Sequence, residues 1–394
     1  MNEFALNDIR VLDCSRVLAG PYCAMLLGDY GADVIKVEQP IVGDPTRQWG
    51  PPFQNGQSTY FQVCNRNKRS ITIDIKQENG QDLIRKLAIE SDIFIENFKT
   101  GYLKKYGLDY ETLSSINPRL IYCSITGYGQ TGPYKDEAGY DYIIQAQSGL
   151  MSITGTDQPV KLGVPIVDIV TGINACHSIL AALYWRERSG TGQFIDCSLL
   201  DNSLSLLTNV AQGYFVAKEK PKRYGNAHPN IVPYQSVHCS DGLLAIAVGS
   251  DKQFLHLAEL LNSQELLSDT FNTNEKRVNN RYKLIQVIER ITMTQTIEYW
   301  LSGMIKLGIP AAKINSIPEI MEDPQVISRQ IVQEINHPEI GRIKQLGHAN
   351  KLSSTPATIR LAPPVLSEHS EEILRDLLHY TDREIKELRN LKII

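Results

Sequence analysis

The stretch Ile9-Arg10-Val11-Leu12-Asp13, followed by Gly20-Pro21 and then by Ala32-Asp33-Val34-Ile35-Lys36-Val37-Glu38, decides the fold of this chain. Both apolar runs are short and rich in Val, Leu and Ile, which is typical of buried strands. Between them, Gly20-Pro21 opens a helix, with proline near its first turn, and Gly31 ends it. The order strand, helix, strand predicts a βαβ unit with two parallel strands.

Similar units follow over the first two hundred residues. Strands are expected at Ser70–Asp74, Asp92–Glu96 and Leu120–Ile125, with a helix over Gln81–Ala88. Repeated units of this kind predict a parallel sheet covered by helices. The fold class is therefore α/β.

The pattern changes after about residue 220, where a loop rich in Gly, Pro and Asn begins. Strands at Tyr234–Cys239 and Leu243–Val248 flank Ser240-Asp241-Gly242 and predict a hairpin, with helices over 252–261, 279–290 and 296–307. Extended segments return from Asp323, and two helices, the last with a Thr381/Glu384 capping box, close the chain. A chain of 394 residues is too long for one simple core. We expect a large domain over 1–215, a small α+β domain over 225–325 and a return to the large domain over 330–394.

Composition excludes several classes of function. The net charge is −4 and charges of both signs are interspersed, which argues against a nucleic-acid partner. The seven cysteines are scattered without a CxxC pair, which favours reduced thiols in a cytoplasmic compartment and argues against a zinc site. We predict no signal peptide at the N-terminus and no membrane span.

Asp168 lies in Val164-Pro165-Ile166-Val167-Asp168-Ile169-Val170-Thr171-Gly172, between two apolar runs, where a strand is expected to give way to a helix that ends near Arg186. A carboxylate in such surroundings is costly unless it is used. One interpretation is a catalytic carboxylate. The other is a simple helix cap, since Asp is a favoured N-cap residue.

Three polar clusters, two after strands and one just before a strand, predict an anion site. The loop Ser15–Pro21 precedes a helix N-terminus, and Glu38 lies where a dinucleotide fold holds a ribose, but the loop has no GxGxxG. Asn65–Ser70, with Lys68 and Arg69, suits phosphate oxygens, although a solvated loop is an equal alternative. Asn97–Lys105 is again basic. Because ligands of open α/β sheets bind beyond the strand ends, the clusters predict a pocket for a phosphorylated, adenine-sized ligand.

Motifs along nearly the whole chain carry a family resemblance. They are Val11–Asp13, Ala19–Pro21, Gly31–Glu38, Asn67–Ser70, Glu96–Phe98, Gly127–Pro133, Gly139–Asp141, Gly163–Gly172, Gly190–Gln193, Gly225–Pro229, Asp323–Val326 and Leu366–His369. Together they resemble the family III CoA-transferases, which act on formyl-CoA, carnitine-CoA and succinyl-CoA and share a superfamily with α-methylacyl-CoA racemase. The resemblance implies a Rossmann-like large domain built from both chain ends, a smaller α+β domain and an interlocked homodimer.

The resemblance also implies the site. Asp168 takes the position of the nucleophile, and Arg16, Val17, Leu18 and Ala19 line the path of CoA. Asn97, Phe98 and Lys105 lie near the adenine and phosphates, and Tyr140 and Asp141 face the same cavity. Acyl-CoA and a carboxylic acid are the implied substrates, with no tightly bound cofactor. Arg16 and Leu18 differ from the His and Gln of formyl-CoA transferase, so specificity for formate and oxalate is not expected, and a dicarboxylate is the predicted acid.

A carboxylate nucleophile suits this reaction because its anhydride and thioester keep the energy of the donor. Asp141 positions the acyl group or the thiolate, or it caps the helix that follows. The first alternative is a racemase, but this sequence has Tyr140 where the racemase arrangement has a basic His. The others are a nicotinamide oxidoreductase, which the missing glycine fingerprint disfavours, and a binding protein without catalysis.

Overall fold

A computed structural model describes residues 4–394. Residues 1–3, part of the segment for which no signal peptide is predicted, lie outside the described residues. The chain divides into two compact units, unit 1 (1–150, 161–215 and 325–394) and unit 2 (151–160 and 216–324). Each is described separately.

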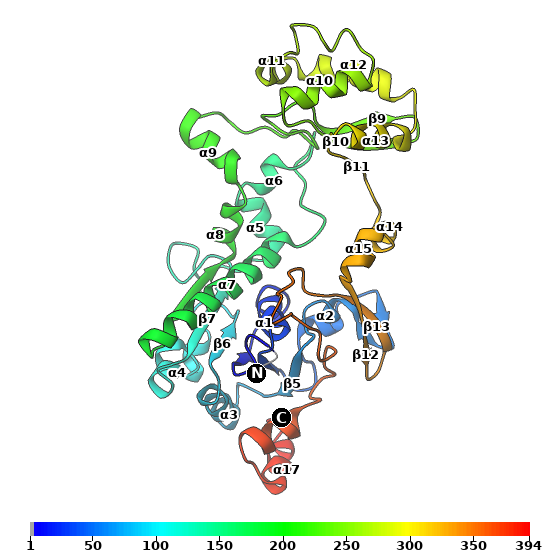
Figure 1. The fold of residues 1–394 in the computed structure, drawn as a ribbon. Coiled ribbons are helices and arrows are strands. Elements are labelled where there is room, and N and C mark those ends of the chain that lie inside the picture. The colour runs from blue at the N-terminus through cyan, green and yellow to red at the C-terminus, as the bar shows by residue number, and fades with distance from the viewer. Residues whose placement is uncertain (1–3) are drawn as a thin grey trace. The chain divides into compact units, whose positions relative to one another are not determined.

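Unit 1 contains a six-stranded parallel sheet (Figure 1). Its strands, in sheet order, are β5 (Lys68–Thr72), β2 (Asp33–Glu38), β1 (Arg10–Asp13), β6 (Ile93–Glu96), β7 (Ile121–Thr126) and β8 (Phe194–Ser198). Numbered along the chain, this order is 3-2-1-4-5-6, that of a doubly wound dinucleotide-binding sheet. The predicted parallel α/β sheet is confirmed. β8 was not predicted.

Alternate residues of the strands feed two cores. Val11 and Ile95 are buried on one face with α1 (Ala19–Asp29) and α7 (Ile166–Ser189). Leu12 and Phe94 are buried on the other face with α3 (Glu78–Ile89), α4 (Tyr110–Ile116) and the C-terminal α17 (Asp382–Asn390). Because successive side chains of a strand point to opposite faces, each strand serves both cores. The predicted capping box at Thr381 and Glu384 of α17 is present.

The C-terminal segment returns to the N-terminal elements of unit 1, as its orange and red ribbon shows in Figure 1. It includes the antiparallel pair β12 (Val332–His337) and β13 (Gly341–Leu346), and the turns α16 (Ser370–Glu372) and η3 (Ile373–Leu377). Asn67 fastens the returning chain: its Oδ1 accepts from the backbone N–H groups of Arg360 (2.6 Å) and Leu361 (2.9 Å), and its Nδ2 donates to Thr358 O (2.9 Å). Unit 1 is thus completed by both ends of the chain.

Unit 2 holds a three-stranded antiparallel sheet in the order β11 (Ala311–Lys313), β10 (Gly242–Ala247) and β9 (Tyr234–Cys239). The predicted hairpin is confirmed as β9 and β10. Four helices accompany the sheet: α10 (Asp251–Leu260), α11 (Asn274–Asn279), α12 (Arg281–Thr292) and α13 (Ile297–Lys306). Residues 151–160, predicted within the large domain, instead belong to unit 2, where Gly155 O accepts from Gly225 N at 2.9 Å.

The described residues form several further short elements. They are η1 (Pro45–Gln48), β3 (Phe53–Gln54), β4 (Gln57–Ser58), α2 (Thr59–Gln62), η2 (Leu103–Tyr106), α5 (Asp141–Gln147), α6 (Leu150–Ile153), α8 (Leu199–Ser205), α9 (Thr208–Ala217), α14 (Ile317–Met321) and α15 (Pro324–Arg329). Within residues 4–394, α7 alone is long and apolar enough by length and composition to cross a membrane. It contributes Val167, Ala175 and Ile179 to the core of unit 1, so its apolar character has a structural explanation.

Candidate active site

The loops that follow β1 and β6 meet at the point where the order of the sheet reverses. β1 and β6 are adjacent parallel strands. The strand after β1, β2, lies on one side of this pair, and the strand after β6, β7, lies on the other. Such a switch point is the usual binding crevice of an open α/β sheet. Two cavities lie here within unit 1, one of about 490 Å³ and one of about 270 Å³. Arg16, Pro45, Trp49 and Phe98 line both, so the cavities adjoin.

Asp168 lines the smaller cavity. The expected strand before it does not form, because α7 begins at Ile166 and residues 161–165 are irregular. The alternative of a helix cap is wrong, since the N-cap residue is Pro165 and Asp168 is the third residue of the helix. The helix also runs past Arg186 to Ser189. Burial, and secondarily the charge of Asp141, raises the pKa of Asp168 to about 7.

Asp141 fixes the start of α7 from another element. It is the first residue of α5, and its Oδ1 accepts from the backbone N–H groups of Val167 (2.8 Å) and Asp168 (3.4 Å). Its Oδ2 accepts from Gln145 Nε2 at 2.7 Å. Asp141 therefore satisfies the N-terminus of α7 rather than capping α5, whose N-cap residue is Tyr140. Tyr140 itself lines the smaller cavity and is largely exposed.

A glycine one turn after Asp168 brings α7 close to α1. A Cβ on Gly172 would lie 2.6 Å from Ala19 O and 3.2 Å from Tyr22 Cβ. Only glycine permits this approach, which brings α7 at Gly172 beside the first turn of α1. Gly127 and Gly139 approach each other just as closely, since a Cβ on either would lie 2.7 Å from the Cα of the other. Both glycines also line the smaller cavity.

The β1–α1 loop is held by the loop after β6. Asn97 Oδ1 accepts from Arg16 N at 2.8 Å, and its Nδ2 donates to Arg16 O at 2.7 Å. Asn97 lines the smaller cavity, but both ends of its amide are used in this contact. Val17, Leu18 and Ala19 line the same cavity. Across the described part of the chain, no acceptor is present for the backbone N–H groups of Leu18 and Ala19 at the start of α1, which suits an anionic group.

Arg16, Phe98 and Tyr102 line the larger cavity, whereas Lys105, predicted to lie near the phosphates, lines neither cavity. The guanidinium of Arg16 lies 4.4 Å from the ring centre of Phe98, and Phe98 stacks on Tyr102 at 5.3 Å. Lys105 Nζ lies 4.0 Å from the centre of the Tyr102 ring. Flat faces beside positive charge fit an aromatic base carrying phosphates.

Lys68 and Arg69 do not form the predicted phosphate contact. Lys68 is fully buried, and its Nζ donates to Asp13 (2.8 Å) and to Asn65 (3.0 Å). Arg69 Nη2 pairs with Asp33 at 2.7 Å and its Nη1 with Glu372 at 2.7 Å. Both cations serve internal ion pairs, so this prediction is corrected. Glu38 pairs with Arg47 at 2.7 Å and also lines the larger cavity.

The segment after β2 contributes cavity residues that were not predicted from the sequence. Trp49 and Pro45 line both cavities. Tyr60, in α2, packs edge-on against Trp49 at 5.2 Å. Burial, followed by the charge of Asp168, raises the pKa of Tyr60 to about 12. The only sequence signal for this segment is its concentration of Pro, Gly and Trp between two βαβ units.

Comparisons with known proteins show the family of this chain. A family model described as CoA-transferase family III matches residues 6–370. The chain is 44% identical to succinyl-CoA:glutarate CoA-transferase of Mus musculus over 97% of this chain and 88% of that protein. It is 45% identical to succinate–glutarate CoA-transferase of Agrobacterium fabrum, over 94% and 95% of the two chains. A crystal structure of a CAIB/BAIF family protein from Brucella suis, 44% identical, superposes with a TM-score of 0.85 over 95% of this chain and all of that one. The chain belongs to CoA-transferase family III.

Proposed function

We propose that this protein transfers CoA from succinyl-CoA to a dicarboxylic acid such as glutarate, through a covalent intermediate on Asp168. The observation that carries the proposal is the carboxylate of Asp168, whose pKa burial raises to about 7, in a cavity that adjoins a second cavity lined by Arg16, Phe98 and Tyr102. The substrates follow from the names of the relatives that are 44% and 45% identical.

CoA fits the two cavities in one orientation. The larger cavity, at about 490 Å³, lies within the range of small-molecule sites, roughly 300–1,000 Å³, and would take the adenosine end beside Phe98 and Tyr102. Arg16, which lines both cavities, would face the phosphates. The pantetheine arm would then carry the thioester into the smaller cavity toward Asp168.

The first half of the reaction moves CoA onto the protein. An oxygen of Asp168 attacks the thioester carbon of succinyl-CoA, the C–S bond breaks, and the thiolate of CoA leaves a mixed anhydride. The thiolate then attacks Cγ of Asp168, the bond from Cγ to the succinyl oxygen breaks, and succinate departs. Asp168 now holds CoA as a thioester.

The second half reverses these steps with the acceptor. A carboxylate of glutarate attacks Cγ of Asp168 and displaces the thiolate of CoA, and the thiolate attacks the glutaryl carbon of the new anhydride. Glutaryl-CoA leaves and the Asp168 carboxylate is restored, so no proton is gained or lost. The unpaired N–H groups of Leu18 and Ala19 belong to residues that line this cavity, and they are suited to the oxyanions of these steps.

The protein is proposed to act as an interlocked homodimer in the cytoplasm, without a tightly bound cofactor. Large apolar side chains of α7 and α9 are exposed in the single chain, including Tyr184 (68%), Trp185 (52%) and Phe215 (62%). Exposed apolar side chains of this size mark an interaction surface. Light scattering coupled to size-exclusion chromatography tests the homodimer, and a monomer would contradict it.

The central test combines turnover with intact-protein mass spectrometry. Incubation with succinyl-CoA and glutarate is expected to form glutaryl-CoA, and incubation with succinyl-CoA alone to leave a CoA adduct that maps to Asp168. Asp168→Ala should lose both. Asp201→Ala, an exposed Asp of α8, is the control and should retain both. Turnover near that of the wild type in Asp168→Ala would refute the mechanism.

A further inference from the structure

Val17 adopts an unusual backbone conformation at the edge of the proposed active site. Its φ angle is +71°, in the left-handed region that β-branched residues avoid. Val17 lines the smaller cavity together with Asp168. Residues held in such conformations need surroundings that fix them, and they concentrate at functional sites.

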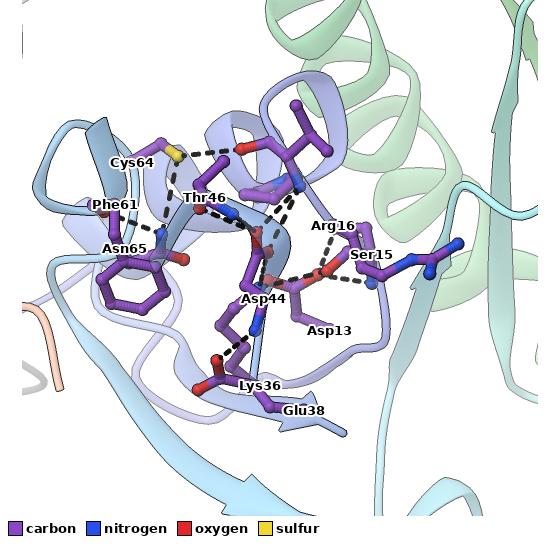
Figure 2. A network of polar contacts seen from close by, with 12 residues as sticks. Asp13, Ser15, Arg16, Lys36, Glu38, Asp44, Thr46, Phe61, Cys64 and Asn65 are labelled. Atoms are coloured by element: carbon purple, nitrogen blue, oxygen red, sulfur yellow. Dashed lines mark hydrogen bonds and ion pairs between the residues drawn. The ribbon is translucent and has the colours of Figure 1, made fainter. Parts of the chain in front are cut away.

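Asp44 supplies the contact that fixes Val17. The backbone N–H of Val17 donates to the Asp44 carboxylate, at 3.2 Å to Oδ2 and 3.4 Å to Oδ1. The side chain of Asp44 is fully buried and pairs with the equally buried Lys36 at 3.0 Å. Its Oδ1 also accepts from Thr46 N (2.9 Å) and Thr46 Oγ1 (2.7 Å). Figure 2 shows Asp44 at the meeting point of the contacts from Lys36 and Thr46.

The same network holds Ser15, two residues before Val17 in the loop. Lys36 Nζ donates to Ser15 O at 3.1 Å, and Ser15 N donates to Asp13 Oδ1 at 3.0 Å. Arg16, which lies between Ser15 and Val17, is held by Asn97. Side chains therefore hold three consecutive residues of the loop, and Val17 depends on Asp44 alone for its N–H contact among the described residues.

Asp44 belongs to the segment that lines the larger cavity. Gly43, Asp44 and Pro45 line it, and Pro45 also lines the smaller cavity. Asp44 N donates to Glu38 Oε2 at 3.0 Å, which ties the segment to the end of β2. One buried carboxylate thus joins the segment around the larger cavity to the loop beside the nucleophile.

We infer that Asp44 is a positioning residue for CoA transfer, which holds the left-handed Val17 so that the β1–α1 loop keeps the shape required beside Asp168. The inference rests on the proposed function, because the loop matters through the reaction at Asp168. It assigns Asp44 no contact with the reacting atoms.

The test is a double-mutant cycle between Asp44 and Val17. Asp44→Asn removes the charge that pairs with Lys36 and weakens the acceptor for Val17 N, and should lower kcat by about tenfold or more while KM for succinyl-CoA changes less than about threefold. Glycine adopts a φ near +71° without strain, so in the Val17→Gly background the loss of kcat caused by Asp44→Asn should shrink to about threefold or less. If Asp44 contributed to stability alone, Val17→Gly would not reduce the loss of kcat caused by Asp44→Asn.

Asp33→Asn is the matched control, because Asp33 lies at the other end of β2 and also pairs with cations, Arg10 at 2.8 Å and Arg69 at 2.7 Å. Its kcat should stay within about twofold of the wild type. A second readout does not depend on activity: in hydrogen exchange, a peptide covering residues 15–22 should exchange faster in Asp44→Asn and at the wild-type rate in Asp33→Asn.

The outcomes separate the inference from the proposed function. Equal losses of kcat in the two backgrounds, or unchanged exchange over residues 15–22 in Asp44→Asn, would overturn the role of Asp44. Absence of CoA transfer in the wild-type protein would overturn the proposed function, while the exchange experiment would still decide whether Asp44 holds the loop.

Discussion

Replacing Asp168 by asparagine should make the protein more stable while it abolishes catalysis. The pKa of Asp168 is raised from 3.8 to about 7, first by burial and then by Asp141. Between these two values the folded protein binds more protons at this site than the unfolded chain does, so wild-type stability falls as the pH rises through this window. Asp168→Asn removes the dependence because its amide does not ionise.

The size of the effect follows from the two pKa values. At about 1.4 kcal/mol for each pH unit, the penalty in the wild type is about 2 kcal/mol near pH 5 and about 4 kcal/mol near pH 8. The stability gained by the variant relative to the wild type should therefore grow between about pH 4 and pH 7 and stay nearly constant above pH 7. Thermal unfolding of both proteins at several pH values measures this difference.

Asp201→Asn is the control for the loss of one negative charge, since Asp201 is exposed on α8. It should show no gain in Tm that grows with pH. If Asp168→Asn is no more stable than the wild type near pH 8, by the magnitude above, the carboxylate is not destabilised by its surroundings and the electrostatic account of the site is wrong.

Three further predictions concern the groups around Asp168. Asp141→Asn removes the charge that contributes to the raised pKa of Asp168 but keeps an acceptor for Val167 N, so the acid limb of the pH profile of kcat/KM should move to lower pH; an unmoved limb would contradict the assignment. Gly172→Ala forces a Cβ to within 2.6 Å of Ala19 O and should lower kcat by about a hundredfold, whereas Gly213→Ala, with no neighbour within 4 Å, should behave as the wild type. Phe98→Ala removes the ring between Arg16 and Tyr102 and should raise KM for succinyl-CoA by about tenfold, and an unchanged KM would place the adenosine end elsewhere.

The sequence predicts the parallel sheet well because its signals are local. The apolar runs of β1 and β2, the Gly20-Pro21 helix start and the hairpin of unit 2 are each contained within a few residues. The sixth strand, β8, was not predicted because its short run Phe194–Ser198 is interrupted by the charged Asp196.

The polar site was harder to predict because its partners are distant in the chain. From local sequence Lys68 is predicted to be a surface cation, but it pairs with Asp13, which lies 55 positions earlier in the chain. Asp141 reads as a helix cap until the N–H of Val167, 26 positions later, is found at its carboxylate. Local sequence carries no information on either meeting. Asp168, which lines the smaller cavity, was predicted as the nucleophile because its apolar surroundings and the family resemblance indicated the same carboxylate.

The contacts of Asn67 with Thr358, Arg360 and Leu361 impose an order on biosynthesis. While the ribosome is still translating residues 325–394, every residue of unit 2 has already been made, but the sheet of unit 1 lacks the segment that fastens it. Domains generally fold as units during synthesis. The inserted unit 2 can therefore fold first, whereas unit 1 is completed only after residues 325–394 have left the exit tunnel.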